Sequence, residues 1–415
     1  MGQYHSRTSW AIYLLVAIFS LCSILRFAQF GAAASQSESQ SATELRGVWI
    51  TNVDSEVLFS QKGVQDAVNR LSSLNFNTIY PTIWQGGYTL YPSPAAQMVI
   101  GRAVDPTPGL QGRDMLQEMV ETGHSQGLSV IPWFEFGFMA PADSELARRH
   151  PDWLTQRRDE TAIKPEGIHE RVWLNPFHPD VQQFILDLIT EVVSNYDIDG
   201  IQFDDHFGLP VEFGYDPLTI KLYQADNAGN SPADEYYETY WVRWRADQLN
   251  RFMERVFQTV KAIKPNCILS LSPNPFHFAL PASLQDWFTW ERRGWVEEIV
   301  LQVYRPDMER FTRELGRTEV ELAKHHIPFA IGIMSGLRND PTAIEIVAQQ
   351  VRETRQQKFA GVSFFFYESL WNWAKESPEQ RQAEIQKLFS TPAVRPAVKP
   401  SKGAVPLSPP HQSAN

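Results

Sequence analysis

This chain of 415 residues has little cysteine, no surplus of basic residues and no glycine-rich phosphate-binding loop. Of its two cysteines, Cys22 lies in an apolar stretch near the amino terminus and Cys267 lies far from it. Neither a disulfide framework nor a cysteine-rich metal site is therefore expected. Lys and Arg total 37 against 48 Asp and Glu, a net charge of -11. This balance argues against nucleic acid as a partner, because phosphate binding needs a basic face.

Histidine pairs that could hold a metal from one helix face are also missing. The ten histidines include the adjacent pair His325 and His326 but no His-x-x-x-His. The tetrapeptide FDDH (203–206) is similar to a motif of polysaccharide deacetylases, where an aspartate pair works beside a metal held by two histidines one helical turn apart. Since that histidine pair is missing, a metal-dependent deacetylase is the less favoured alternative. We expect no metal and no cofactor.

The amino terminus has the three-part layout of a secretory signal. His5 and Arg7 precede an apolar run over residues 10–25, and Ala32 to Ala34 offer a small-residue cleavage site. We expect residues 1–34 to be a signal peptide. An uncleaved anchor that tethers the protein to the membrane is the alternative, although the run is slightly short for a membrane span. The expected location is the periplasm or cell envelope, or outside the cell.

Composition divides the remaining chain into a spacer, a folded unit and a tail. Residues 35–44 are almost entirely polar and are expected to form a flexible spacer. Residues 391–415 contain six prolines and no periodic apolar pattern, so a disordered tail is expected there. Residues 45–390 are then one folded catalytic domain.

Within this domain, short apolar or aromatic runs alternate with amphipathic helical patterns, which is typical of a parallel sheet. The expected strands are residues 45–51, 77–84, 128–135, 198–205, 267–272, 298–304, 328–334 and 361–367. The expected helices are residues 64–74, 113–126, 180–196, 237–263, 310–325 and 342–358. Eight such pairs predict a (β/α)8 TIM barrel, with an open α/β sheet as the alternative. Long βα loops over 85–112, 136–179 and 206–236 would surround its carboxyl-end mouth.

Strand alternation predicts which side chains point into the barrel. In the fourth strand, Ile201 and Phe203 suit the helix layer, so Gln202 and Asp204 are expected to point inward. The same alternation places Glu135 inward at the end of the third strand. Two carboxyl groups therefore end neighbouring strands.

The other residues expected near the mouth suit a sugar, whose hydroxyl groups need hydrogen bonds and whose apolar faces stack on aromatic rings. For any single tryptophan, a place in the core is an equally good interpretation. The expected substrate-binding residues are Trp84, Trp133, Gln202, Asp205, His206, Gln302, Tyr304 and Trp371. Asp205 and His206 would mainly support the catalytic residue through loop hydrogen bonds.

Glycoside hydrolysis needs two carboxyl groups, separated by about 5 to 5.5 Å for retention or about 6.5 to 9.5 Å for inversion. We expect Asp204 to be the nucleophile or base and Glu135 to be the general acid. Glu368, which follows the eighth strand, is the competing acid. For Asp204 and for Glu135, the alternative is a purely structural carboxylate. For the whole protein, the alternative is a non-catalytic glycan-binding barrel.

Several long segments between about residue 44 and about residue 390 resemble the glycosyl hydrolase-like 10 family of bacterial barrels. They read ELRGVWITNVDS, NTIYPTIWQGGYTLYPS, GLSVIPWFEFGFM, HPDWL, VWLNPFHPDVQQFILDLI and YDIDGIQFDDHFGLP. The resemblance matches Asp204 to the aspartate that amylase-like retaining carbohydrases place on the fourth strand. It also implies a cell-envelope glycan as substrate, in particular peptidoglycan glycan strands stripped of their peptides.

Overall fold

The computed structural model of the chain describes residues 42–398. The expected signal peptide or anchor (1–34) and residues 35–41 of the expected spacer lie outside the described residues, as do residues 399–415 of the expected tail. Within residues 42–398, every helix is too short or too polar to cross a membrane.

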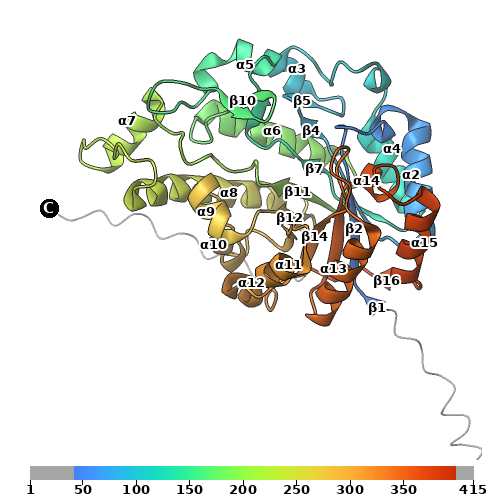
Figure 1. Cartoon of the computed structure of the whole chain (residues 1–415). Helices are drawn as coiled ribbons and strands as arrows, with labels where there is room; N and C mark the ends of the chain where they lie inside the picture. The colour runs from blue at the N-terminus through green and yellow to red at the C-terminus, as the bar shows by residue number, and fades with distance from the viewer. Residues whose placement is uncertain (1–41, 399–415) are drawn as a thin grey trace, which may run out of the picture. The chain divides into compact units, whose positions relative to one another are not determined.

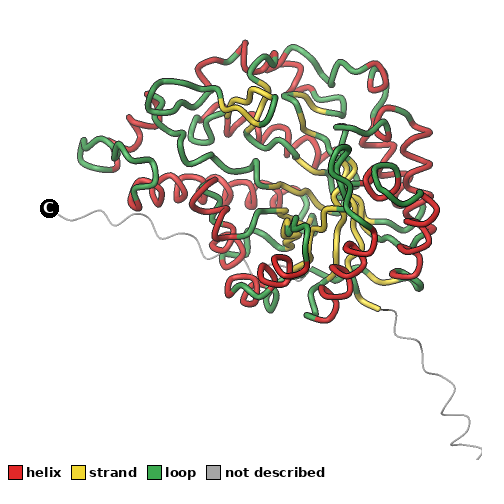
Figure 2. Tube along the Cα trace, viewed as in Figure 1, coloured by secondary structure: helices red, strands yellow, loops and turns green. Residues whose placement is uncertain are grey.

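Eight parallel strand positions form the centre of the fold (Figures 1 and 2). Their bounds are β2 (Leu45–Ile50), β3 (Thr78–Pro81), β6 (Ser129–Val130) with β7 (Trp133–Phe134), β11 (Gly200–Asp204), β12 (Ile268–Ser272), β13 (Glu298–Gln302), β14 (Phe329–Met334) and β15 (Gly361–Phe365). They lie in the order β6-β3-β2-β15-β14-β13-β12-β11-β7. The two ends of this order, β6 and β7, are halves of the one strand expected over residues 128–135. The sheet therefore closes on itself, which confirms the (β/α)8 barrel over an open sheet.

The third barrel strand is interrupted at Pro132. Proline has no backbone N–H and so cannot donate to a sheet ladder. Its carbonyl still accepts from Gln202 N at 2.8 Å, and Ile131 N donates to Ile79 O at 2.9 Å. Hydrogen bonds to both neighbouring strands therefore persist across the interruption, and the ring of strands stays closed.

Helices cover the outside of the barrel (Figure 1). The principal ones are α2 (Gln61–Ser73), α4 (Met115–Ser125), α6 (Pro179–Asn195), α8 (Thr239–Ile263), α10 (Trp287–Arg292), α11 (Met308–Leu315), α12 (Thr318–Ala323), α13 (Ile344–Gln356) and α15 (Pro378–Leu388). Ser60, Asp114 and Asp307 begin three of them by accepting a backbone N–H from the first turn. The single helix expected over 310–325 is wrong, because the chain breaks at Gly316 and Arg317 and forms α11 and α12 instead.

Strand alternation separates the two faces as expected. Ile201 and Phe203 join the large core between strands and helices, whereas Trp49, Tyr80 and Trp133 form a separate cluster inside the barrel. A chain of polar groups crosses that interior. Trp49 Nε1 donates to Gln202 Oε1 at 2.6 Å, and Gln202 Nε2 donates to Ser270 Oγ at 2.8 Å. Ser270 Oγ and the Tyr80 hydroxyl both donate to Glu298 Oε1, at 2.9 and 3.0 Å.

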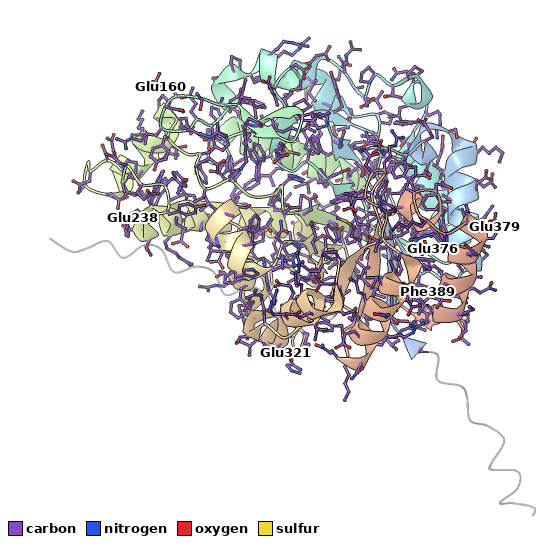
Figure 3. The ribbon with its side chains drawn as sticks, in the orientation of Figure 1. Glu160, Glu238, Glu321, Glu376, Glu379 and Phe389 are labelled. Atoms are coloured by element: carbon purple, nitrogen blue, oxygen red, sulfur yellow. The ribbon has the colours of Figure 1, made fainter. Side chains whose placement is uncertain are left out.

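The carboxyl-terminal segment closes the amino-terminal end of the barrel, so the disordered tail expected from residue 391 is wrong for residues 391–398. Short strands β1 (Ala42–Thr43) and β16 (Ala393–Val394) occur here, and Glu44 N donates to Val394 O at 3.0 Å. The Arg395 side chain is only 12% exposed and pairs with the buried carboxylate of Glu298. Phe389, labelled in Figure 3, lies beneath the guanidinium of Arg46 at 4.6 Å. The composition of residues 391–415 gave no indication of this buried ion pair.

Loops and short elements at the carboxyl ends of the strands build the mouth. They include the hairpin β4 (Trp84–Gln85) and β5 (Tyr88–Thr89), a small antiparallel sheet of β8 (Met139–Pro141), β9 (Lys164–Glu166) and β10 (His169–Trp173), and the helices α3 (Pro94–Ile100), α5 (Glu145–Arg149), α7 (Pro217–Asp226), α9 (Phe276–Ser283) and α14 (Tyr367–Trp371). Single 3-10 turns cover Val57–Phe59, Pro108–Leu110 and Pro151–Trp153. Active sites of such barrels form at this end.

Candidate active site

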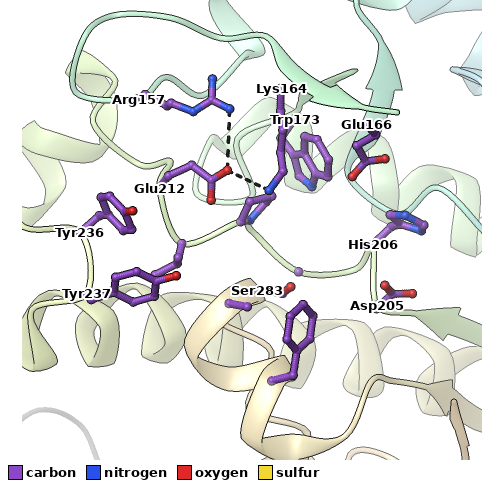
Figure 4. Close-up of a pocket in the computed structure, with 15 residues that line it drawn as sticks. Arg157, Lys164, Glu166, Trp173, Asp205, His206, Glu212, Tyr236, Tyr237 and Ser283 are labelled. Carbon is purple, nitrogen blue, oxygen red and sulfur yellow. Dashed lines mark ion pairs between the residues drawn. The ribbon is translucent and has the colours of Figure 1, made fainter. Parts of the chain in front are cut away.

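A cavity of about 620 Å³ opens among the loops that follow β7, β11 and β12 (Figure 4), and we call it the cleft. Its volume lies within the range of small-molecule sites, roughly 300 to 1,000 Å³. In the view of Figure 4, Asp205 and His206 lie at one side and Tyr236 and Tyr237 at the other. Its labelled lining residues are Arg157, Lys164, Glu166, Trp173, Asp205, His206, Glu212, Tyr236, Tyr237 and Ser283.

Asp204 is the last residue of β11 and lies just inside the barrel. It is 2% exposed, and one carboxylate oxygen accepts the backbone N–H of His206 at 2.9 Å. Burial raises the pKa of Asp204 to about 7, although the neighbouring His206 lowers it. This carboxyl group can therefore change its protonation near neutral pH.

His206 connects the two carboxyl-bearing strands. Its Nδ1 lies 2.9 Å from the backbone oxygen of Glu135 and 3.4 Å from a carboxylate oxygen of Asp204. Because a carbonyl oxygen only accepts, Nδ1 carries a proton in this arrangement. Burial lowers the pKa of His206, but the carboxylates of Asp204 and Asp205 outweigh that effect and raise it to about 10. The imidazole is 27% exposed and also lines the cleft.

Glu135 follows β7 and is held by hydroxyl groups from the two preceding strands. Its Oε2 accepts from Thr51 Oγ1 at 2.9 Å and from Thr82 Oγ1 at 2.8 Å. The residue is 8% exposed, and burial raises its pKa, while the two hydroxyl groups and His206 oppose the rise. Asp204 and Glu135 thus lie at neighbouring strand ends, with His206 in contact with both residues.

Asp205 lies on the cleft side of β11, and two amides orient its carboxylate. Gln302 Nε2 donates to Oδ1 at 3.0 Å, and Asn274 Nδ2 donates to Oδ2 at 2.8 Å. Gln302 was expected to bind substrate, and in the structure its side-chain amide holds Asp205. Asn274 was not anticipated, although its place directly after β12 could have marked it.

Tyr304 follows β13 and lies near all three carboxyl groups. Burial raises the pKa of its phenol well above the usual value, with further contributions from Asp205, Asp204 and Glu135. Its ring packs on Phe365 with centroids 5.4 Å apart. The half-buried Tyr304 therefore belongs to the same group of residues, and its expected contact with substrate stays a prediction.

Two other expected sugar contacts lie beneath the site rather than in it. Gln202 is fully buried and is occupied by its hydrogen bonds with Trp49 and Ser270. Trp133 is almost fully buried and packs on Trp49 with centroids 6.3 Å apart. Both residues form the floor of the barrel mouth, so their assignment as sugar contacts is corrected.

Trp84 and Trp371 are core residues, which also corrects their assignment. Both are completely buried. Trp84 Nε1 donates to Gly137 O at 3.0 Å, and its ring packs edge-on against Phe184. The ring of Trp371 lies beneath the guanidinium of Arg70 at 3.9 Å. The strand was expected over residues 77–84, but β3 ends at Pro81, so the alternation used for Trp84 no longer applied there.

Glu368 lies away from Asp204. It is part of α14, after β15, and β15 and β11 lie on opposite sides of the closed ring. Its Oε1 accepts from Ser55 Oγ at 3.1 Å. The structure does not bring Glu368 to Asp204, which makes it the weaker candidate for the partner acid.

Asp204, Asp205 and His206 can each offer one metal-ligand atom within 4.8 Å of the others. Several of these atoms are already engaged: both oxygens of Asp205 accept amide hydrogen bonds, and His206 Nδ1 contacts a carbonyl. No second histidine joins the group among residues 42–398. The donor set therefore differs from the two-histidine site of a metal-dependent deacetylase.

Comparisons with known proteins agree with this architecture. Glycosyl hydrolase DigH from Escherichia coli (strain K12) is 28% identical over 339 residues, which cover 71% of this chain and 72% of that protein. Glycosyl hydrolase YngK from Bacillus subtilis (strain 168) is 28% identical over 264 residues, or 57% of this chain and 46% of that protein. The solved glycoside hydrolase domain of PgaB (BpsB) from Bordetella bronchiseptica has a similar fold. Its TM-score is 0.63 at 12% identity, over 85% of this chain and 100% of that chain.

A family model also matches most of the barrel. The match covers residues 44–352, from the start of β2 into α13, so it ends before the boundary near residue 390 expected from the sequence. It includes β11 and the residues that lie around Asp204. The chain therefore belongs to the glycosyl hydrolase-like 10 family, with a glycoside hydrolase-like barrel.

Proposed function

We propose that this protein is a glycoside hydrolase that cleaves a cell-envelope glycan with Asp204 and Glu135 and without a metal. The observation that carries the proposal is the placement of two buried carboxyl groups at neighbouring strand ends. His206 and Tyr304 lie close to both of them, and an aromatic-lined cleft opens beside them. Paired carboxyl groups next to a carbohydrate-sized cavity are the arrangement that glycoside hydrolysis requires.

The surroundings of the two carboxyl groups suggest their roles. Asp204 lies beside the imidazole of His206, whose positive charge stabilises the ionised form of the aspartate. Burial raises the pKa of Glu135 and favours its protonated form, against two donated hydroxyl hydrogen bonds and the charge of His206, which lower that pKa. We assign Asp204 as nucleophile or base and Glu135 as the acid that protonates the glycosidic oxygen. Oε1 of Glu135 accepts no hydrogen bond from the described residues and is the oxygen assigned to carry that proton.

The cleft is suited to sugar rings. Tyr236, Tyr237 and Phe278 are exposed aromatic residues, and Trp173 lies deeper in the same cavity. Glu212 forms ion pairs with Lys164 at 2.8 Å and with Arg157 at 3.7 Å (Figure 4). Aromatic faces between fixed polar groups bind sugars through stacking and hydrogen bonds.

The substrate class rests on the family and on the expected export signal. Two relatives are called glycosyl hydrolases, and the resemblance to the family implies peptidoglycan glycan strands free of peptides. An exported protein would meet such strands in the periplasm or cell envelope. We therefore propose peptide-free peptidoglycan strands as the leading substrate, with the amino-terminal segment as signal or membrane tether.

The test is to incubate the purified protein with peptide-free peptidoglycan strands and with neutral polysaccharides, and to measure new reducing ends. Wild type should release fragments from the peptidoglycan strands, and Asp204→Asn should not. Binding of glycan without release by wild type would favour a non-catalytic glycan-binding barrel. Full activity of Asp204→Asn would contradict the proposed mechanism.

A metal-dependent polysaccharide deacetylase is the less favoured alternative, and it would have to use the cluster of Asp204, Asp205 and His206. Its product would be acetate rather than a new reducing end. Dialysis against a chelator, followed by both assays, separates the two activities. The proposed hydrolase should keep its activity after chelation, whereas chelator-sensitive acetate release would replace the proposal with the deacetylase.

A further inference from the structure

A second cavity, of about 420 Å³, opens at the same end of the barrel, and we call it the far cavity. Its walls follow the carboxyl ends of β2, β14 and β15. They are formed by Asn52, Asp54, Ser55, Glu56, Phe59, Arg338, Glu368 and Trp373. Its volume also lies within the range of small-molecule sites.

The far cavity and the cleft lie on opposite sides of the barrel mouth. The far cavity adjoins β2 and β15, which are neighbours in the ring, whereas the cleft adjoins β7, β11 and β12. In the closed order of strands, β11 lies half-way round from β15. Figure 1 shows α14, which carries Glu368, beside β2.

The two proposed catalytic carboxyl groups are linked to both cavities through neighbouring residues. Glu135 accepts a hydrogen bond from Thr51, and the next residue, Asn52, lines the far cavity. On the other side, His206 lines the cleft and contacts both Asp204 and Glu135. A glycan that fills both cavities would therefore cross the pair of carboxyl groups.

The walls of the far cavity combine an aromatic ring with polar groups. The guanidinium of Arg338 lies over the Trp373 ring at 4.9 Å and pairs with Asp54 at 3.1 Å. The amide oxygen of Asn52 is buried and accepts no hydrogen bond from any residue of the described chain. This group can receive a hydroxyl hydrogen bond from a ligand.

The charge of these walls indicates which sugars fit. Three carboxylates, Asp54, Glu56 and Glu368, face one guanidinium, and that guanidinium is already paired with Asp54. A further carboxylate on a ligand would be repelled. An uncharged sugar ring, stacked near Trp373, suits this cavity better than an acidic one.

We propose that the far cavity binds an uncharged sugar unit of the glycan beyond the scissile bond, so that the protein cleaves within a chain rather than at its end. This inference rests on the proposed hydrolase function. An enzyme that releases terminal sugars needs a site closed on one side of the carboxyl groups. Here an open, carbohydrate-sized cavity lies on each side.

The first test follows product size during hydrolysis of long peptide-free peptidoglycan strands labelled at the reducing end. Internal cleavage shortens the mean chain length before any monosaccharide or disaccharide accumulates. Initial release of only terminal mono- or disaccharides would overturn the inference and leave the hydrolase function intact.

The second test compares kcat/KM for a tetrasaccharide and an octasaccharide of the same glycan. Wild type should prefer the longer chain, and Trp373→Ala should reduce that preference about fivefold, since stacking on an aromatic ring is worth roughly 1 kcal/mol. Glu56→Ala changes an exposed wall residue and should reduce the preference several-fold without affecting folding. Glu121→Ala, on the outer helix α4, is the matched control and should keep the wild-type preference.

A purely structural effect of the substitutions would lower activity on both oligosaccharides equally. Such a result in both Trp373→Ala and Glu56→Ala would overturn the inference.

Binding to an inactive protein separates this inference from the proposed function. Asp204→Asn should bind the octasaccharide more tightly than the tetrasaccharide, and adding Trp373→Ala should remove the difference. If no glycan is hydrolysed but this difference is observed, the proposed hydrolase fails while the far cavity stands as a binding site. Equal affinity for both oligosaccharide lengths would reject the far cavity as a sugar-binding site.

Discussion

The imidazole Nδ1 of His206 lies 3.4 Å from a carboxylate oxygen of Asp204, in a site where the aspartate is almost completely buried. Each residue changes the proton affinity of the other: the carboxylate raises the pKa of His206, and the imidazole lowers that of Asp204.

Asp204→Asn should reduce kcat by about a thousandfold or more, because the amide can neither attack nor accept a proton. New reducing ends measured from peptide-free peptidoglycan strands give the comparison. Asp152→Asn makes the same chemical change at an exposed position and should leave kcat unchanged. A loss below about tenfold in Asp204→Asn would show that another group performs the step.

The pH profile of kcat/KM should have an acid limb near pH 7, because the reactive form of Asp204 is ionised and its pKa is about 7. Activity should therefore rise as pH increases through that value. In His206→Asn the imidazole no longer lowers the pKa of Asp204, so the limb should move to higher pH. If the acid limb does not move in His206→Asn, a group other than Asp204 sets it.

Stability should depend on pH in the opposite direction. Folding raises the pKa of Asp204, so its contribution to stability is complete below the usual value of 3.8 and is lost as pH rises through about 7. Asp204→Asn removes this pH-dependent contribution to stability. Thermal unfolding should then show the variant gaining stability relative to wild type between pH 5 and pH 8, by about 1 kcal/mol or more. A stability difference that is independent of pH would contradict the raised pKa.

Thr82→Val should move the alkaline limb of the pH profile to higher pH. The Thr82 hydroxyl donates to Glu135 Oε2 at 2.8 Å and lowers the pKa of that carboxyl group. Its removal favours the protonated form, which is the form of Glu135 that donates the proton. Thr318→Val, at an exposed position of α12, should leave the profile unchanged. An unchanged alkaline limb in Thr82→Val would mean that Glu135 is not the acid.

Arg395→Ala should lower the free energy of unfolding by about 3 to 5 kcal/mol, because it leaves the buried carboxylate of Glu298 without its cation. The double variant Arg395→Met with Glu298→Gln removes both charges and should lose much less. Urea unfolding of the full chain gives both values. Equal losses in the two variants would show that the ion pair itself is unimportant.

Much of this fold could be predicted from the sequence because it depends on local periodicity. Alternation along residues 198–205 placed Asp204 inward and Phe203 outward, and the order of apolar runs predicted the barrel. Backbone geometry enforces that alternation wherever a strand is continuous. It failed at Trp84, since the second barrel strand had already ended at Pro81.

The sequence by itself therefore determined the barrel, its family and the two carboxyl-bearing strand ends. Tertiary structure alone decided which groups surround those carboxyl groups. Asn274 and Gln302 reach Asp205 from later strands, and Arg395 reaches Glu298 from the end of the described chain. Such contacts form because closure of the barrel brings together residues that are far apart in the sequence. No local sequence pattern indicates which of these residues will meet. The two cavities on opposite sides of the mouth arise in the same way, from loops that meet only when the ring of strands is closed.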